Sequence, residues 1–320
     1  MTRRPAIIAG SVLAALLLAF FAGPSVTIDT QLKPFTLPAD LDEYLARSEA
    51  RFPDIIPGTE KKIIWAHAAK TKTPLAIVYL HGFSATRQET APLCDSVAAR
   101  LGANLFYTRL TGHGRGGPAL AEASVNDWLN DTEEAYEIGR RLGDSVIVIG
   151  TSTGATLATW LAEQANTQSV AAYVLMSPNY ALKDGRSEVL TWPWGAQLAA
   201  LIAGPEISSP SRNELDARYW THRYPSRALV PMLGLLKFVR ASEVERIRAP
   251  MLVVYSPSDQ VLDVRVTERV YARLGSRNKQ VRRILHSQNP SGHVLAGDIA
   301  APRDTPMVAR LILGFIASLR

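Results

Sequence analysis

The sequence has almost no cysteine: Cys94 is the only one among 320 residues. A single thiol cannot form an intramolecular disulfide, a cysteine zinc cluster or an iron–sulfur site. Charged residues are also moderate at 20%, whereas hydrophobic residues make up 47%, which excludes a mainly disordered chain. The length suits one large α/β domain or two ordinary domains. We therefore expect a folded chain with a sizeable core.

The excess of positive charge is small and local. The net charge is +6, and between Lys237 and Arg283 eleven basic residues stand against five acidic ones. Basic residues spaced along helices usually point into water, and we favour this interpretation. Contact of that stretch with anionic lipid is the alternative. A local excess of this size does not indicate a nucleic-acid partner.

Charge is missing altogether from one N-terminal run. Arg3 and Arg4 precede Ala6–Gly23, eighteen residues without a charge. As a helix this run would be about 27 Å long, close to the roughly 30 Å of a hydrocarbon core. The two arginines place the N-terminus on the cytoplasmic side. We predict that segment 1–23 is a transmembrane helix and that the rest of the chain lies outside the cell membrane.

Whether that segment is removed depends on the residues at its end. Cleavage after Ala22 or Gly23 would put Phe20 or Phe21 at the third position back, where a small residue is expected. We therefore favour an uncleaved signal anchor. Secretion after cleavage of a signal peptide is the alternative.

Beyond a linker and an N-terminal helix in residues 24–60, short apolar runs alternate with amphipathic stretches of helix length. This alternation predicts an α/β fold with a mostly parallel central sheet covered by helices on both faces. The expected strands are Lys61–Ala66, Leu75–Leu80, Asn104–Leu110, Val146–Ile149, Val170–Met176, Met251–Tyr255 and Gln280–Leu285. The expected helices are Ala39–Phe52 with Asp40 as its cap, Glu89–Leu101, Ser124–Leu142, Thr153–Gln164, Val264–Leu274 and Thr305–Leu319.

One segment interrupts the alternation. Residues 182–245 contain helix formers and five prolines but no clear strand. A loop of that length without structure of its own would be unusual in a compact domain. We therefore predict a helical cap inserted into a core made of residues 61–181 and 246–320.

A catalytic pattern follows the fourth expected strand. Gly150-Thr151-Ser152-Thr153-Gly154 has the form G-x-S-x-G, with an apolar strand before it and a helix after it. Such a sharp turn exposes its serine in a strained backbone conformation, which favours Ser152 as a nucleophile. An ordinary helix-capping turn is the alternative interpretation.

A serine hydroxyl needs a base, and the base needs an acidic partner that orients it. Of the histidines after Ser152, His222 falls in the insertion and His286 ends an expected strand, whereas His293 lies in a loop after the last strand. Asp259 directly follows the strand ending at Tyr255. Asp263 is the competing acid, but its position suits the cap of the next helix. Ser152, Asp259 and His293 would all lie at carboxyl ends of strands, where open α/β sheets place their sites.

The same chemistry needs two backbone donors for a developing oxyanion. We assign the N–H groups of Phe83, in the turn after the second strand, and Thr153, directly after the serine. His81 in that turn is expected to form hydrogen bonds within it, and His113 is expected to shape the loop after the third strand.

With these motifs together, the chain from about Lys61 to Leu319 resembles the α/β-hydrolase superfamily, in particular bacterial carboxylesterases, monoacylglycerol lipases and related lysophospholipase-like and serine aminopeptidase-type enzymes. The residues that carry the resemblance are His81–Phe83, Arg109–Gly114, Gly150–Gly154, Ser258–Val261, Ser291–Leu295 and Asp298. The resemblance implies Ser152 as nucleophile, His293 as base, Asp259 as its orienting acid and a helical cap.

We therefore expect a serine hydrolase that cleaves short- or medium-chain acyl esters, or monoacyl lipids, through an acyl-enzyme without a metal or organic cofactor. Trp192 and Trp220 in the cap are the candidate substrate contacts, because the insertion carries half of the six tryptophans. A peptidase or acyltransferase with the same triad, and a non-catalytic binding protein of this fold, are the alternatives.

Overall fold

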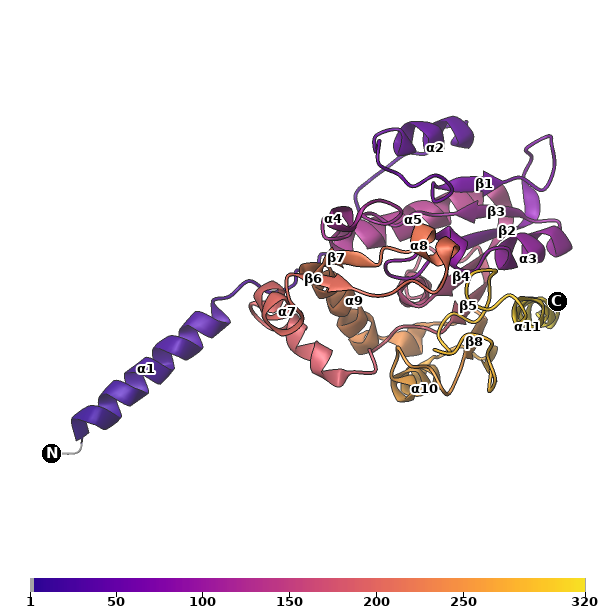
Figure 1. The fold of residues 1–320 in the computed structure, drawn as a ribbon. Helices are drawn as coiled ribbons and strands as arrows, with labels where there is room; N and C mark the ends of the chain where they lie inside the picture. Colours follow the sequence, from indigo (N-terminus) through magenta and orange to yellow (C-terminus); the bar gives the residue numbers. More distant parts are fainter. Residues whose placement is uncertain (1–2, 320) are drawn as a thin grey trace.

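Seven strands form one central sheet in the computed structural model, which describes residues 3–319 (Figure 1). Their order is β1-β3-β2-β4-β5-β8-β9; β1 runs antiparallel to β3, and the other neighbours are parallel. Each lies where the sequence predicts a strand, so the mostly parallel sheet is confirmed. The strands are β1 (Lys62–Ile64), β2 (Thr73–Leu80), β3 (Asn104–Tyr107), β4 (Gly143–Thr151), β5 (Val170–Met176), β8 (Met251–Tyr255) and β9 (Lys279–Arg283).

Helices cover both faces of this sheet, as predicted. Side chains alternate along β2, so that Val78 packs into one apolar cluster and Tyr79 into the other. The first cluster is covered by α5 (Val125–Leu142), α6 (Thr153–Ala162) and α10 (Val264–Arg273), and the second by α3 (Leu93–Leu101) and α11 (Thr305–Ala317). A short helix, α4 (Gly117–Leu120), follows β3.

Local capping sets where several helices begin. Asp40 accepts a hydrogen bond from the Glu43 N–H at the start of α2 (Leu41–Glu49), as predicted. Ser124 and Asp127 form a reciprocal capping box on α5. By contrast, α3 begins four residues later than predicted, because residues 87–89 form a 3₁₀ turn and Pro92 precedes the helix.

The insertion between β5 and β8 is mainly helical, with α7 (Gly195–Ala203), α8 (Glu214–Tyr219) and α9 (Leu229–Ala241), and 3₁₀ turns at 185–191, 226–228 and 244–246. It also contains an antiparallel ladder that the sequence does not predict, between β6 (Glu206–Ser208) and β7 (Arg223–Pro225). Strands of three residues are too short to show alternation. Helix α9 buries Leu233, Leu235 and Leu236 in the core. The boundaries of the cap stay a prediction.

Helix α1 (Arg3–Phe21) projects from the body of the molecule (Figure 1). It ends at Phe21, and its 19 residues include Arg3 and Arg4, which leaves 17 uncharged residues, or about 26 Å. Within residues 3–319, no helix combines the length and apolar character that crossing a membrane requires. The predicted transmembrane helix in segment 1–23 is therefore not confirmed; Met1 and Thr2 lie outside the described residues.

Trp194 of the cap forms hydrogen bonds to the C-terminal end of α1. The Trp194 indole N–H donates to the carbonyl oxygens of Ala19 and Phe20, 3.2 and 3.1 Å away. Its backbone N–H donates to the Pro24 oxygen at 2.8 Å. The ring passes so close to Gly23 that any side chain there would collide with it. Gly23 therefore permits the junction between α1 and the cap.

Candidate active site

Strand pairing brings three turns together at the carboxyl edge of the sheet. Leu80 pairs with Gly150, and Thr151 pairs with Met176. The turn after β2, the turn between β4 and α6, and the loop after β5 are consequently neighbours. The loop after β8 joins them, because Met176 also pairs with Val254.

Ser152 occupies the turn between β4 and α6 with φ 53° and ψ −118°, an uncommon conformation for a residue with a side chain. The two motif glycines make this turn possible. A Cβ on Gly154 would lie 2.1 Å from the Leu80 oxygen, and one on Gly150 would lie 2.5 Å from the Gly154 oxygen. The backbone thus passes too closely here for any larger residue. Ser152 occupies the N-cap position of α6, but its side chain makes no capping hydrogen bond, unlike the serine of an ordinary capping turn.

His293 lies between Ser152 and Asp259. Its Nε2 is 3.1 Å from the Ser152 Oγ, and its Nδ1 is 2.8 Å from the Asp259 Oδ2. All three side chains are largely shielded; Ser152 is 7% exposed and Asp259 3%. The structure therefore brings together the three residues that the sequence predicts, in a hydrogen-bonded chain.

Further hydrogen bonds fix Asp259 and His293. The second Asp259 oxygen, Oδ1, accepts from the N–H groups of Val261 and Leu262 at 2.7 and 3.0 Å. The Ser177 hydroxyl donates to the His293 backbone oxygen at 2.6 Å. Asp263 instead caps α10 and pairs with Arg265, as predicted. The Arg265 guanidinium lowers the pKa of that carboxyl.

Two backbone N–H groups adjoin the serine. Thr153 is the first residue of α6, so its N–H has no acceptor within the helix. Phe83 follows Gly82 in the turn after β2, and its N–H has no hydrogen bond to any described residue. The ring of Phe83 packs edge-on against the rings of Trp128 and Tyr224.

His81 forms one hydrogen bond within this turn, as predicted, and a second one to the loop after β3. Its Nδ1 donates to the Gly82 oxygen at 2.9 Å, because its Nε2 accepts from the Leu110 N–H at 3.1 Å. Burial lowers the pKa of His81 to about 4, and it holds the pKa of His113 well below its ordinary value. The two neutral rings lie 5.0 Å apart, and His113 also packs edge-on against Phe83. Both histidines therefore shape the loops and are not available as bases.

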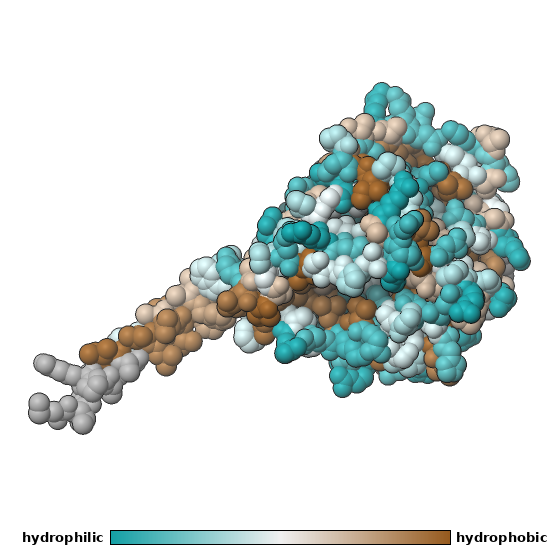
Figure 2. Space-filling view, in the orientation of Figure 1, coloured by the Kyte–Doolittle hydropathy of each residue, from teal (hydrophilic) through white to brown (hydrophobic). Residues whose placement is uncertain are grey.

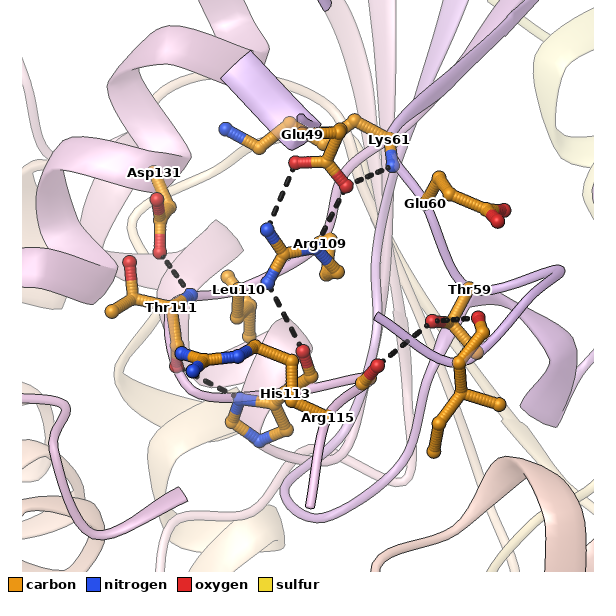
Figure 3. Close-up of polar contacts among 12 residues, drawn as sticks. Glu49, Thr59, Glu60, Lys61, Arg109, Leu110, Thr111, His113, Arg115 and Asp131 are labelled. Carbon is orange, nitrogen blue, oxygen red and sulfur yellow. Dashed lines mark hydrogen bonds and ion pairs between the residues drawn. The ribbon is translucent and has the colours of Figure 1, made fainter. Parts of the chain in front are cut away.

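Carboxylates from helices α2 and α5 hold the loop after β3 through hydrogen bonds (Figure 3). The Arg109 guanidinium donates to both Glu49 oxygens, at 2.8 and 2.9 Å, and to the His113 oxygen at 3.1 Å. Asp131 of α5 accepts from the Thr111 N–H at 2.6 Å. Burial raises the pKa of Asp131 to about 6. The motif Arg109–Gly114 thus supports the Phe83 turn through His113.

The cap contacts the same turn from outside. The Thr221 N–H donates to the Ser84 oxygen at 2.7 Å, and the Tyr224 ring lies 5.6 Å from the Phe83 ring. Of the two predicted substrate contacts, Trp220 packs under the Arg212 guanidinium. Trp192 is 52% exposed and packs edge-on against Phe20 of α1.

Sequence reasoning missed two residues near the serine. Tyr224 lies in β7, a strand that no pattern indicates. Glu89 is 2% exposed and accepts hydrogen bonds from the Gly82 N–H and the Tyr79 hydroxyl. Its only signal was an acidic residue in a turn close to the His81–Phe83 motif. His222 bonds to Ser209 and Asp216 within the cap.

Comparison with known proteins matches residues 71–287 to a family described as serine aminopeptidase, S33. A thermostable monoacylglycerol lipase of Bacillus sp. (strain H-257) is 25% identical over 246 residues, which cover 76% of this chain and 91% of that enzyme. A structure from work on LipS and LipT, two metagenome-derived lipolytic enzymes, superposes with a TM-score of 0.68 at 21% identity, over 82% of this chain and 99% of that one. A soluble variant of monoglyceride lipase from Saccharomyces cerevisiae superposes with a TM-score of 0.62 at 13% identity, over 81% and 91%.

Proposed function

Since the chain belongs to the serine aminopeptidase (S33) family and is a carboxylic ester hydrolase of the α/β-hydrolase fold, we propose that Ser152, His293 and Asp259 are its catalytic triad. One observation carries the proposal. The Ser152 hydroxyl, the His293 ring and the Asp259 carboxylate form a continuous chain of hydrogen bonds of 3.1 and 2.8 Å.

The geometry assigns a role to each side chain. His293 donates its Nδ1 proton to Asp259, which leaves Nε2 free to accept the proton of Ser152 as its Oγ attacks the ester carbon. The N–H groups of Phe83 and Thr153 stabilise the negative oxygen that forms. The protonated His293 then passes its proton to the leaving alcohol, and an acyl group remains on Ser152. Water activated by His293 hydrolyses this acyl-enzyme.

We propose short- or medium-chain acyl esters or monoacyl lipids as the substrates. Two features support this class: a relative is a monoacylglycerol lipase, and apolar rings from the cap and the core surround the Phe83 turn. The family description favours a second candidate, peptide hydrolysis by the same triad. Rates on p-nitrophenyl esters of graded chain length, beside aminoacyl-anilides, separate the two; faster cleavage of the anilides would reject the ester proposal.

Covalent labelling tests the nucleophile directly. We expect a fluorophosphonate probe to add one label to the wild type and none to Ser152→Ala. Ser169→Ala is the matched control, because that serine bonds to Tyr136 and precedes the amino end of β5, at the edge of the sheet opposite to the triad. Labelling that persists in Ser152→Ala would reject the assignment.

We also propose that α1 holds the protein at a cell membrane, with the hydrolase domain on the non-cytoplasmic side. Large apolar side chains are exposed along this helix (Figure 2): Ile8, Val12, Leu13, Leu16, Leu17, Leu18 and Phe21. Tryptophans at the end of an apolar helix are typical of a membrane interface, and Trp192 and Trp194 lie there. Removal of the segment as a signal peptide is the alternative.

The basic stretch 237–283 adds little to this proposal. Arg240, Arg265 and Arg273 are each paired with a carboxylate, Glu188, Asp263 and Glu245 respectively. Paired charges attract anionic lipid weakly, so the apolar helix and the tryptophans are the features that support attachment.

A further inference from the structure

A second carboxyl group lies beside the candidate nucleophile. Glu89 ends the 3₁₀ turn that follows the Phe83 loop, and its side chain points back under that loop. Its Oε1 accepts from the Gly82 N–H at 2.6 Å and from the Tyr79 hydroxyl at 2.7 Å. The side chain is fully enclosed. Neither the triad nor the fold of the sheet accounts for an acid at this place.

Gly82 lies next to both Glu89 and the candidate nucleophile Ser152. A Cβ added to Gly82 would lie 3.0 Å from the Glu89 Oε2 and 3.2 Å from the Ser152 Cβ. The Glu89 carboxyl group and the Ser152 side chain therefore both lie beside the same position of Gly82. The Tyr79 hydroxyl extends the connection, because it also lies 3.0 Å from the hydroxyl of Thr151, the residue before Ser152.

The Gly82 N–H is the donor immediately before that of Phe83. A hydrogen bond from Gly82 therefore fixes the orientation of the chain that carries the Phe83 N–H. We propose that Glu89 is a positioning residue of this site, whose carboxyl group holds the Gly82–Phe83 segment with the Phe83 N–H toward the nucleophile. The inference rests on the proposed function of Ser152 and Phe83 and adds a residue to it.

The charge of Glu89 then matters for catalysis. Burial raises the pKa of Glu89 to about 8. The hydrogen bonds from Tyr79 and Gly82 and the positive charge of Arg212 in the cap act in the opposite direction, but their effect is smaller. Of the other groups that face it, burial raises the pKa of Tyr79 and Cys94, so both are neutral, and Arg212 is itself paired with Asp216. At pH 7, below this pKa, Glu89 is therefore mostly protonated.

A neutral acid and a carboxylate differ in their effect on an oxyanion. Both can accept the Gly82 hydrogen bond, but a carboxylate would repel the negative charge that develops at Phe83 and Thr153. We therefore expect kcat for ester hydrolysis to fall by roughly 10- to 100-fold as Glu89 ionises above about pH 8.

Two variants separate the positioning role of Glu89 from the effect of its charge. Glu89→Gln retains an oxygen for Gly82 and Tyr79 but cannot ionise. We expect its kcat at pH 7 to stay within about threefold of the wild type, with the alkaline fall abolished. Glu89→Ala releases the loop, and we expect kcat to fall by roughly 10- to 100-fold with little change in KM, because only transition-state stabilisation is weakened.

A matched control is available on α6. Glu163 caps the far end of that helix, about 16 Å along the axis from Ser152, and burial also raises its pKa. Glu163→Gln is expected to keep the wild-type pH profile, and thermal melting verifies that each variant is folded.

The outcomes distinguish this inference from the proposed function. Ester hydrolysis and fluorophosphonate labelling by the wild type, both lost in Ser152→Ala, establish the function independently of Glu89. With those established, a wild-type kcat in folded Glu89→Ala, or an unchanged alkaline fall in Glu89→Gln, would overturn the role of Glu89.

Discussion

His293 donates its Nδ1 proton to Asp259 across 2.8 Å, although the two residues are 34 positions apart in the chain. Asp263, only four residues beyond Asp259, points away and caps α10. The two acids follow the same strand, yet of the two only Asp259 is in contact with His293. Their substitutions should therefore have very different consequences.

Replacing each acid by its amide tests this contrast. We expect Asp259→Asn to lower kcat by on the order of 10⁴, because the amide stabilises the wrong tautomer of His293. Asp263→Asn should leave kcat near the wild type, because asparagine also caps helices well. Steady-state kinetics on one p-nitrophenyl ester measures both. A severe loss in Asp263→Asn with little effect of Asp259→Asn would exchange the two roles.

The glycine at the start of α6 is expected to be irreplaceable. Gly154→Ala would place a methyl group 2.1 Å from the Leu80 backbone oxygen, so the turn that holds Ser152 must shift. We expect loss of both activity and thermal stability. Gly314→Ala is the control, because nothing lies within 4 Å of its new methyl group in the last turn of α11. This variant should gain about 0.5–1 kcal/mol of stability from helix propensity. Equal melting temperatures for the two variants would contradict the expectation.

Stability should depend on pH through Glu89. Burial raises the folded-state pKa from the ordinary 4.5 to about 8, so between these values the folded chain binds more protons than the unfolded chain. Its contribution is therefore complete below about pH 4.5 and is lost as pH rises toward 8, at up to roughly 1.4 kcal/mol per pH unit. Chemical denaturation from pH 5 to 8 should show a flatter dependence for Glu89→Gln than for the wild type. Parallel curves would show that this carboxyl group does not titrate as stated.

Acyl chain length tests the cap residues. We expect kcat/KM to rise from acetyl to medium-chain esters, since an apolar pocket discriminates by about 1–3 kcal/mol per methylene. Trp220→Ala and Trp192→Ala should flatten this rise if their rings contact the acyl chain, as we propose. A profile that neither substitution changes would exclude both tryptophans as substrate contacts and leave Tyr224, next to Phe83, as the cap residue to substitute.

Membrane attachment has a direct test. We expect the full chain to remain with membranes after alkaline carbonate extraction and to keep Arg3 and Arg4 at its N-terminus. A mature N-terminus near Gly23 or Pro24 would show instead that the segment is a removed signal peptide.

The sequence predicts most of the framework because local chemistry determines it. The five inner strands of the sheet are apolar and largely buried, whereas the edge strand β9 is polar and partly exposed. Asp40, Ser124 and Asp263 cap their helices through neighbouring backbone groups. The serine turn is only partly local. Gly150 is required by a contact with Gly154 in the same turn, whereas Gly154 is required by a contact with Leu80 at the end of β2.

The remaining features depend on residues far apart in the chain. Glu89 becomes part of the site only because β2 and β4 pair and bring Gly82 beside Ser152. The short ladder of β6 and β7 forms by pairing across the cap and has no periodicity to reveal it. The position of Trp192 beside Phe20 likewise depends on where α1 leaves the body of the molecule.

The hydrogen bonds of Trp194 have a practical consequence for anyone who shortens this protein. Deleting the residues before Ser25 to improve handling would remove the three carbonyl acceptors that Trp194 uses, on Ala19, Phe20 and Pro24. It would also uncover Trp192, which now packs on Phe20. A truncated enzyme would thus differ from the full chain at the start of α7 as well as in its proposed attachment to a membrane. Kinetic constants from the two forms should be compared before the shorter one is taken to represent the other.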